Sequence, residues 1–165
     1  MGRHRFLIAL GSNRRHQRHG NPRAILRAAL QELDSGKVDV LAASPIIETP
    51  PLGPSRRRFA NAAALVRTRL APEDLLHKLQ KLERKFGRRS GGRRWGERVL
   101  DLDIVLWNGG PFVADGLVIP HPHYRERMFV LSPAMKVAPD WCDPLTGLTL
   151  RHQAARLTRP QPATR

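Results

Sequence analysis

Two segments with helical spacing, each flanked by short strand-like runs, constrain the fold of this chain more than any other feature. Apolar residues recur at helical spacing in residues 22–33 and again in residues 72–86. Strand-like runs occupy residues 5–11, 38–48, 59–70 and 99–107. The resulting order, β-α-β-β-α-β, is that of a split βαβ unit. We therefore predict an α+β fold: a ferredoxin-like antiparallel sheet core with both helices on one face, and extra C-terminal loops and short helical pieces.

Local residues mark where the helices begin and end. Asn21 precedes the first helix as a candidate N-cap, and Pro72 stands at the first position of the second helix. Gly87 is placed to stop that helix. The proline pair after Thr49 cannot donate to a ladder, so it ends the strand that begins near Val38.

Length and composition indicate one domain in a reducing compartment. The 165 residues suffice for a single core, which we place in residues 1–150. Residues 151–165 are basic without apolar periodicity, and we predict a disordered tail there. Cys142 is the only cysteine, which excludes an internal disulfide framework. No apolar run is long enough for a signal peptide or a membrane span, so we expect a cytoplasmic protein without membrane contact.

The charge is unusual for such a chain. Lys and Arg total 29 against 14 Asp and Glu, a formal net charge of +15. This balance favours polyanionic partners such as nucleotides, nucleic acid or acidic membranes. Solvated arginines without any partner explain it equally well, because composition alone does not locate a site.

The most specific pattern is the pair Asp101 and Asp103 in the strand-like segment RVLDLDIVLW. Alternate residues of a strand project on one side, so the two carboxylates lie together. Leu100, Leu102, Ile104 and Leu106 then take the other side and enter the core. Adjacent carboxylates repel unless a cation lies between them, and oxygen ligands suit Mg²⁺. The alternative is a solvated polar face with arginine partners.

A glycine- and arginine-rich segment, GRRSGGRRWGER at residues 87–98, precedes these aspartates. Arginine forks match phosphate oxygens, and glycines let a loop close over a ligand. The arrangement suits phosphoryl transfer, in which positioning and charge neutralisation dominate. An RNA-gripping segment with Trp95 stacked on a base is the alternative. The P-loop and protein-kinase motifs are both absent from the sequence.

Two weaker constellations flank this region. His121 lies between two prolines, where it can serve a phosphate or simply form a turn. Phe59 and Asn61 share a face of their strand, which offers stacking and a paired donor and acceptor for a heterocycle. A core phenylalanine beside a turn asparagine is the alternative.

Six segments together resemble one enzyme family, 6-hydroxymethyl-7,8-dihydropterin pyrophosphokinase, over most of the chain. They are IALGSN (8–13), TPPLG (49–53), FANAA (59–63), APEDLLHKLQKLERKFGR (71–88), RWGERVLDLDI (94–104) and IPHPHYRERMFVLSP (119–133). The resemblance implies a 2-amino-4-hydroxy-6-hydroxymethyldihydropteridine diphosphokinase of folate biosynthesis. Such an enzyme transfers pyrophosphate from ATP to 6-hydroxymethyl-7,8-dihydropterin and releases AMP and the pterin diphosphate.

The resemblance also implies roles for individual residues. Asp101 and Asp103 would hold two Mg²⁺ ions on the ATP phosphates, and the loop residues Arg88 and Arg98 would be catalytic. The residues implied for ATP binding are Gln80, Glu83, Trp95, His121 and Arg127. Those implied for pterin binding are Thr49, Pro50, Pro51, Leu52, Gly53, Phe59, Asn61 and Phe129. Partners are then small molecules, and we expect a monomer that does not bind nucleic acid.

The chain departs from the family pattern in its loops, and other functions remain as alternatives. Residues 14–20 and 55–58 are unusually basic, and Glu97 stands where proline is usual, beside the expected catalytic Arg98. An RNA-binding module is one alternative, since ferredoxin-like sheets also bind RNA. Aromatic residues total only 5%, however, and the sheet lacks an aromatic-rich RNA-binding strand. An enzyme-like scaffold without activity is the other alternative.

Overall fold

A computed structural model describes residues 3–14, 16, 18–49, 59–87 and 99–160. The main sheet contains β1 (His4–Ser12), β2 (Val38–Ala43), β3 (Ile47–Thr49), β4 (Phe59–Thr68) and β5 (Asp101–Trp107). Its order is β2-β4-β1-β5, with β3 paired to the start of β4, and every pairing is antiparallel. The predicted ferredoxin-like order of the sheet is confirmed.

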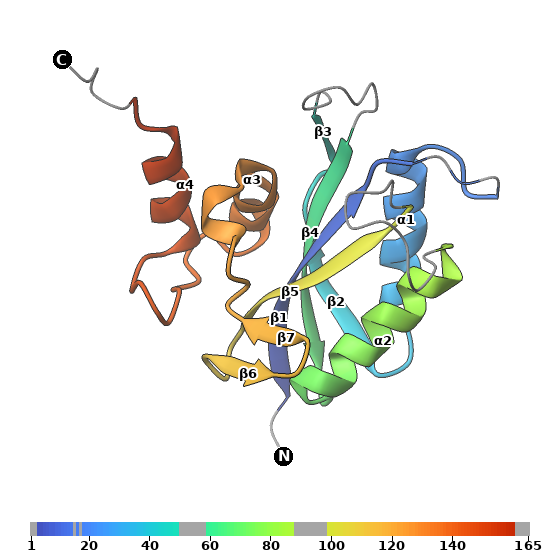
Figure 1. The fold of residues 1–165 in the computed structure, drawn as a ribbon, viewed down its shortest axis with the longest axis horizontal. Helices are drawn as coiled ribbons and strands as arrows, with labels where there is room; N and C mark the ends of the chain where they lie inside the picture. Colours follow the sequence, from blue (N-terminus) through green and yellow to red (C-terminus); the bar gives the residue numbers. More distant parts are fainter. Residues whose placement is uncertain (1–2, 15, 17, 50–58, 88–98, 161–165) are drawn as a thin grey trace.

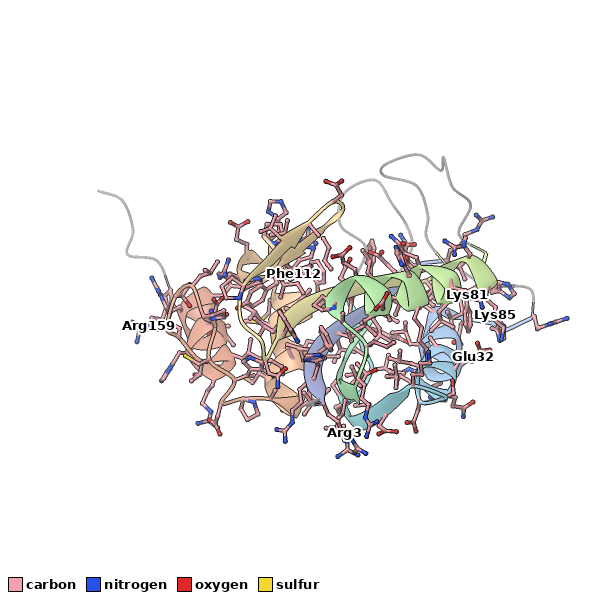
Figure 2. The ribbon with its side chains drawn as sticks, turned by 90° about the horizontal axis from the view of Figure 1, so that it is seen from below. Arg3, Glu32, Lys81, Lys85, Phe112 and Arg159 are labelled. Atoms are coloured by element: carbon pink, nitrogen blue, oxygen red, sulfur yellow. The ribbon has the colours of Figure 1, made fainter. Side chains whose placement is uncertain are left out.

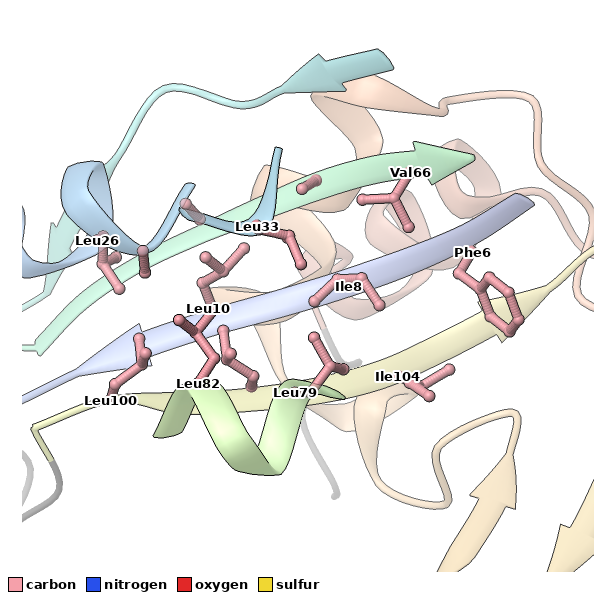
Figure 3. Close-up of a cluster of buried hydrophobic side chains, with 14 of the residues drawn as sticks. Phe6, Ile8, Leu10, Leu26, Leu33, Val66, Leu79, Leu82, Leu100 and Ile104 are labelled. Atoms are coloured by element: carbon pink, nitrogen blue, oxygen red, sulfur yellow. The ribbon is translucent and has the colours of Figure 1, made fainter. Parts of the chain in front are cut away.

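Helices α1 (Pro22–Leu33) and α2 (Pro72–Lys85) cover one face of this sheet (Figure 1). Their apolar stripes meet the even-numbered residues of β1 and β4, as Figure 3 shows for Leu33, Leu79 and Ile8. The predicted cap of α1 is present, because the Asn21 side chain accepts from the Ala24 N–H at 2.9 Å. Gly87 follows α2 with a φ of 104°, a conformation that glycine adopts readily.

A salt bridge joins the outer surfaces of these two helices. Lys85 near the end of α2 lies 2.9 Å from the Glu32 carboxylate of α1, and Figure 2 shows both side chains at the same end of the molecule. Lys85 is largely exposed, so this pair adds little to stability. The buried apolar side chains between the helices and the sheet hold this layer together.

The second face of the sheet is covered by the C-terminal elements, which the sequence predicted as loops and short helical pieces beyond the ferredoxin-like core. After β5 come the hairpin of β6 (Phe112–Ala114) and β7 (Leu117–Ile119) and the 3₁₀ turn η1 (Tyr124–Glu126). Helices α3 (Met128–Val137) and α4 (Leu150–Thr158) follow and lie on the side opposite α1 and α2 (Figure 1). Leu7, Ala63 and Leu131 belong to this second core.

The prediction of a disordered tail from residue 151 is wrong for residues 151–158. They form most of α4, which Thr149 caps through its hydroxyl oxygen. Leu150, Gln153 and Ala154 are buried on one side of the helix. A short apolar stripe with a buried glutamine in it does not stand out as helical periodicity, which explains the error.

Two strand predictions need adjustment. The predicted strand at residues 38–48 is interrupted after Ala43, because Pro45 lacks an N–H and the chain turns there into β3. In β5, Ile104 pairs with Ile8 and Leu106 pairs with Leu7, so Val105 is an extra, bulged residue. The bulge turns Leu106 into the second core, on the opposite side from Leu102 and Ile104.

Among the described residues, no helix combines the length and the apolar character needed to cross a bilayer.

Candidate active site

Two transverse rows of residues form the centre of the candidate site on the α3 side of the sheet. Gly11 of β1 pairs with Asn61 of β4 on one side and with Asp101 of β5 on the other. One step along the sheet, Ala9 pairs with Ala63 and Asp103 in the same way. Directly paired residues share a face, so Asn61 and both aspartates project to the same side.

Small residues keep the floor between these polar groups flat. Gly11 and Ala9 are both half-buried, and they separate Asn61 from the aspartates. A Cβ atom placed on Gly11 would lie 3.3 Å from the Asn61 Oδ1 atom. That distance is tighter than an ordinary contact, so a side chain at position 11 would crowd Asn61 and fill the middle of the site.

Asn61 carries a buried donor that has no partner among the residues that the structure describes. The residue is 7% exposed, and within the described part of the chain its Nδ2 atom makes no hydrogen bond. A buried amide N–H₂ left unpaired costs about 1–3 kcal/mol, so such groups call for a ligand or an ordered water. The donor and acceptor of one carboxamide suit the edge of a heterocycle.

The two aspartates are half-buried and lie on the predicted common side of β5. Residues two apart in a strand are separated by roughly 7 Å, which leaves room for cations between or in front of their carboxylates. In the described residues no third acidic, histidine or cysteine side chain completes a protein metal cluster. A pair of carboxylates fits Mg²⁺, which is usually held by one or two carboxylates and takes waters and substrate phosphates as its other ligands.

Two aromatic rings lie on the Asn61 side of the candidate site. Phe59 lies two residues before Asn61 on β4, on the same face, and it pairs with Thr49 of β3. Phe129 lies in the first turn of α3, the helix that packs over β4 and β3, and its side chain is 36% exposed. An exposed ring at this place is available for stacking.

His121 is held against the strand that carries the aspartates. Its backbone N–H donates to the carbonyl of Val105, the bulged residue of β5, at 3.0 Å. Its Nδ1 atom accepts from the His123 N–H at 3.2 Å, so the neutral ring carries its proton on Nε2. Burial lowers the pKa of His121, and the charges of Arg127 and His123 lower it further, while Asp101 opposes them. The ring is therefore a neutral N–H donor at pH 7.

Arg127 lies at the N-terminus of α3, between His121 and Phe129. Its guanidinium carbon is 5.8 Å from the centre of the Phe129 ring. Because Arg127 and Asp101 both act on the pKa of His121, a basic group, a neutral histidine and an acidic group share this corner of the site. Such a mixture suits a phosphate chain with bound cations.

Comparison with known proteins decides the family. The family model for 7,8-dihydro-6-hydroxymethylpterin-pyrophosphokinase (HPPK) matches residues 7–139. This chain belongs to the HPPK family. A curated relative from Pseudomonas aeruginosa, named 2-amino-4-hydroxy-6-hydroxymethyldihydropteridine pyrophosphokinase, is 41% identical over 138 residues, which is 82% of each chain. A relative of the same name from Methylorubrum extorquens is 37% identical over 155 residues, which is 93% of each chain.

Solved structures support the fold. An HPPK-DHPS structure from Plasmodium falciparum matches with a TM-score of 0.73 at 14% sequence identity. The match covers 94% of this chain and 44% of that one, so the HPPK chain described here spans less than half of the longer protein. At this identity the likeness shows the fold alone.

The remaining residues expected for an HPPK site fall in two groups. Gln80 and Glu83 lie on α2, across the sheet from α3; Gln80 is exposed and Glu83 is 2% exposed. Glu83 accepts a hydrogen bond from the Leu102 N–H at 3.0 Å, so it reaches the backbone between the two aspartates. The other group lies outside the described residues: Pro50, Pro51, Leu52, Gly53, Arg88, Trp95 and Arg98.

Sequence reasoning missed three residues that shape this HPPK site. Gly11 forms the floor, and its signals were its place at the end of an apolar run and in the segment IALGSN. Val105 anchors His121 through a bulge, which depends on the pairing register and has no local signal. Tyr124 is fully buried beneath the turn between His121 and Arg127, although a tyrosine in a histidine- and arginine-rich segment suggests an exposed one.

Proposed function

We propose that this HPPK-family chain transfers a pyrophosphoryl group from ATP to 6-hydroxymethyl-7,8-dihydropterin in folate biosynthesis, releasing AMP. The observation that carries the proposal is the row Asn61–Gly11–Asp101. It sets a carboxamide donor that has no partner among the described residues and an acidic pair on one face, separated by a residue with no side chain. A heterocycle on one side and a metal-bound phosphate chain on the other would then meet over Gly11. The relatives' shared name supports the same activity.

The pterin side would be built from β4, β3 and α3. Asn61 would donate to and accept from the pterin edge, and Phe59 and Phe129 would stack on its faces. Thr49 and the following residues 50–53 would add backbone contacts. A planar ring suits this corner because the neighbouring floor residues Gly11 and Ala9 are small.

The nucleotide side would be built from β5 and the segment after β7. Asp101 and Asp103 would hold two Mg²⁺ ions, whose positive charge would offset the charge of the triphosphate. His121 would donate its Nε2–H, and Arg127 its guanidinium, to phosphate oxygens. We propose that Gln80 and Glu83 also belong to the ATP side, with Trp95 closing over it and Arg88 and Arg98 acting on the transferring group.

The residues of this chain would act by alignment and charge. The hydroxymethyl oxygen of the pterin attacks the β-phosphorus of ATP in line, its proton passes to solvent, and AMP leaves. Asn61 and the two rings fix where that oxygen points, and His121 and Arg127 fix the phosphates. No side chain of the described site is placed as a general base, so positioning and electrostatic stabilisation would supply the rate.

Cell context and partners follow the same proposal. The substrates are small molecules, and we propose a monomer in the cytoplasm, where a lone thiol such as Cys142 stays reduced. The RNA-binding alternative has less support. Ferredoxin-like sheets that bind RNA stack bases on an open face, whereas α3 packs over the centre of this face beside Leu7 and Ala63.

An AMP-release assay on matched variants tests the proposal. Wild type is expected to form AMP from ATP only when both the pterin and Mg²⁺ are present. Asp101→Asn and Asp103→Asn should remain folded and lose about a hundredfold or more of turnover, because each removes a metal-ligand charge. The control Asp39→Asn removes an exposed aspartate of β2 and should keep wild-type rates. A wild-type protein that releases no AMP from both substrates would refute the proposal.

A further inference from the structure

One buried carboxylate organises the C-terminal part of the chain. Asp143 has no exposed surface, and its Oδ2 atom accepts hydrogen bonds from the Tyr124 hydroxyl, from Arg125 Nε at 2.7 Å and from Gln153 Nε2 at 3.1 Å. Its Oδ1 atom accepts from the Leu145 N–H at 2.8 Å. A carboxylate with this many donors is ionised and held in one orientation.

These donors come from separate parts of the chain. Tyr124 and Arg125 belong to η1, and Gln153 belongs to α4. Asp143 itself lies between α3 and α4, beyond residue 139, where the match to the family model ends. The carboxylate therefore ties a segment outside the family match to the turn that carries expected ATP-binding residues.

The backbone of Tyr124 connects Asp143 to His121 and to Arg127. Its N–H donates to the His121 carbonyl at 3.5 Å, and its carbonyl accepts from the Arg127 N–H at 3.2 Å. The side chain is fully buried, and its hydroxyl ends on Asp143. A shift of this ring would move the backbone of His121 and of Arg127 together.

His121 and Arg127 are also held by contacts of their own, at His123 and at the Phe129 ring. His121 is fixed at its start by the Val105 carbonyl, and the Arg127 carbonyl receives the first N–H groups of α3. Between these two points, backbone hydrogen bonds join His121 to Tyr124 and Tyr124 to Arg127. The Tyr124 hydroxyl and Arg125 Nε link this turn to Asp143, which Gln153 in turn links to α4.

We infer that Asp143, through Tyr124, is a positioning residue that sets His121 and Arg127 for the triphosphate of the nucleotide. The inference rests on the proposed function, because it assigns the nucleotide to this corner. Asp143 does not touch the substrate. Its expected signature is a loss of nucleotide affinity in molecules that are still folded, with pterin affinity unchanged.

Tyr124→Phe tests this directly, because it removes one buried hydroxyl and keeps the ring. The matched control is Thr68→Val, which also removes one buried hydroxyl, at the end of β4 far along the sheet from Asn61. The Thr68 hydroxyl donates to the Lys37 carbonyl at 2.6 Å and accepts from the Leu70 N–H. Both variants should lower the melting temperature by similar amounts.

Calorimetry with a non-hydrolysable ATP analogue, Mg²⁺ and, separately, the pterin gives the decisive dissociation constants. We expect Tyr124→Phe to bind the ATP analogue about tenfold more weakly than wild type, a change of the size that one lost buried hydrogen bond produces. Its dissociation constant for the pterin should equal that of wild type. Thr68→Val should bind both as wild type does. A merely structural role would lower the folded fraction and leave the dissociation constant of the folded molecules unchanged. Unaltered nucleotide binding by Tyr124→Phe, or equal weakening by Thr68→Val, overturns the inference.

A second variant covers a Tyr124→Phe protein that does not fold, and measurements on wild type separate failure of this inference from failure of the proposed function. If Tyr124→Phe does not fold, Gln153→Leu serves instead, because it removes the donor to Asp143 that comes from α4. Gln153→Leu should also weaken nucleotide binding, but by less than the tenfold expected for Tyr124→Phe. Unchanged nucleotide binding by Gln153→Leu then overturns the inference. A wild-type protein that binds both ligands yet releases no AMP refutes the proposed function alone. Wild type that binds no nucleotide overturns both.

Discussion

The Glu83 carboxylate accepts a hydrogen bond from the backbone N–H of Leu102, the residue between Asp101 and Asp103, at 3.0 Å. β5 is an edge strand of the main sheet, so a helix side chain satisfies a donor on its outer side. Glu83 is almost fully buried there. A residue that the family resemblance assigns to ATP thus also holds the strand that presents the two aspartates.

Replacing Glu83 should therefore affect both stability and metal use. Glu83→Leu leaves the Leu102 N–H without its acceptor, and we expect a loss of about 1–3 kcal/mol in the free energy of unfolding. Turnover should also need more Mg²⁺, because the strand between the aspartates is less well held. Urea unfolding and a Mg²⁺ titration of AMP release measure the two effects. Glu73→Gln, on the exposed side of the same helix, is the control. Wild-type stability in Glu83→Leu would contradict this account.

A methyl group at position 11 should impair the site without harming the fold. Gly11 does not have a positive φ, so alanine fits its backbone. The added Cβ lies 3.3 Å from Asn61 Oδ1 and intrudes on the floor of the site. We expect Gly11→Ala to bind pterin about tenfold more weakly, with unfolding free energy equal to wild type or higher by about 0.5–1 kcal/mol. Pterin titration with urea unfolding is the measurement, and unchanged pterin affinity would contradict the proposed floor.

Asn61→Asp tests the role of the Asn61 Nδ2 donor. The substitution keeps the shape of the side chain, removes the Nδ2–H₂ group and adds a negative charge opposite Asp101. Sites built to hydrogen-bond a ligand discriminate strongly when one partner is lost, so pterin affinity should fall about a hundredfold. Asn108→Asp, where Oδ1 accepts from the Arg5 N–H at the other end of the sheet, keeps its acceptor and should bind pterin normally. Equal pterin affinity in the two variants would exclude a role for the Asn61 donor.

Acid stability should depend on Asp143. Burial alone would raise its pKa, but hydrogen bonds from Arg125, Tyr124, Leu145 and Gln153 prevail and hold the pKa well below its usual range. The unfolded chain therefore takes up a proton near pH 4 that the folded chain does not, and stability is lost as the pH falls below that value. Urea unfolding should show the stability difference between wild type and Asp143→Asn in full above about pH 5. A difference that does not shrink toward pH 3 would contradict the ionised carboxylate.

The parts of the fold that could be predicted from the sequence are those with local periodicity. The helices at Pro22–Leu33 and Pro72–Lys85 repeat apolar residues on one side, and the strand order follows from their sequence. The Asp101 and Asp103 pair was also predictable, because alternation along one strand places both on one face. Helix α4 was not, since its buried side includes the polar Gln153.

The missed features of the site depend on long-range pairing. The partners of Asp143 lie 18 and 19 residues away in η1, and no local pattern links them. The bulge at Val105 is set by how β5 pairs with β1, and it decides both where Leu106 points and where His121 attaches. Such features appear only when strands from distant parts of the chain are brought together.

The fate of the β-phosphorus of ATP tests the central claim most directly. Wild-type protein is mixed with the hydroxymethyl pterin, Mg²⁺ and ATP that carries a radioactive β-phosphorus, and the products are separated. Transfer of the pyrophosphoryl group predicts that all label leaves the nucleotide and appears on the pterin diphosphate, beside unlabelled AMP. Labelled ADP with a pterin monophosphate, or labelled free pyrophosphate in the absence of pterin, would contradict it.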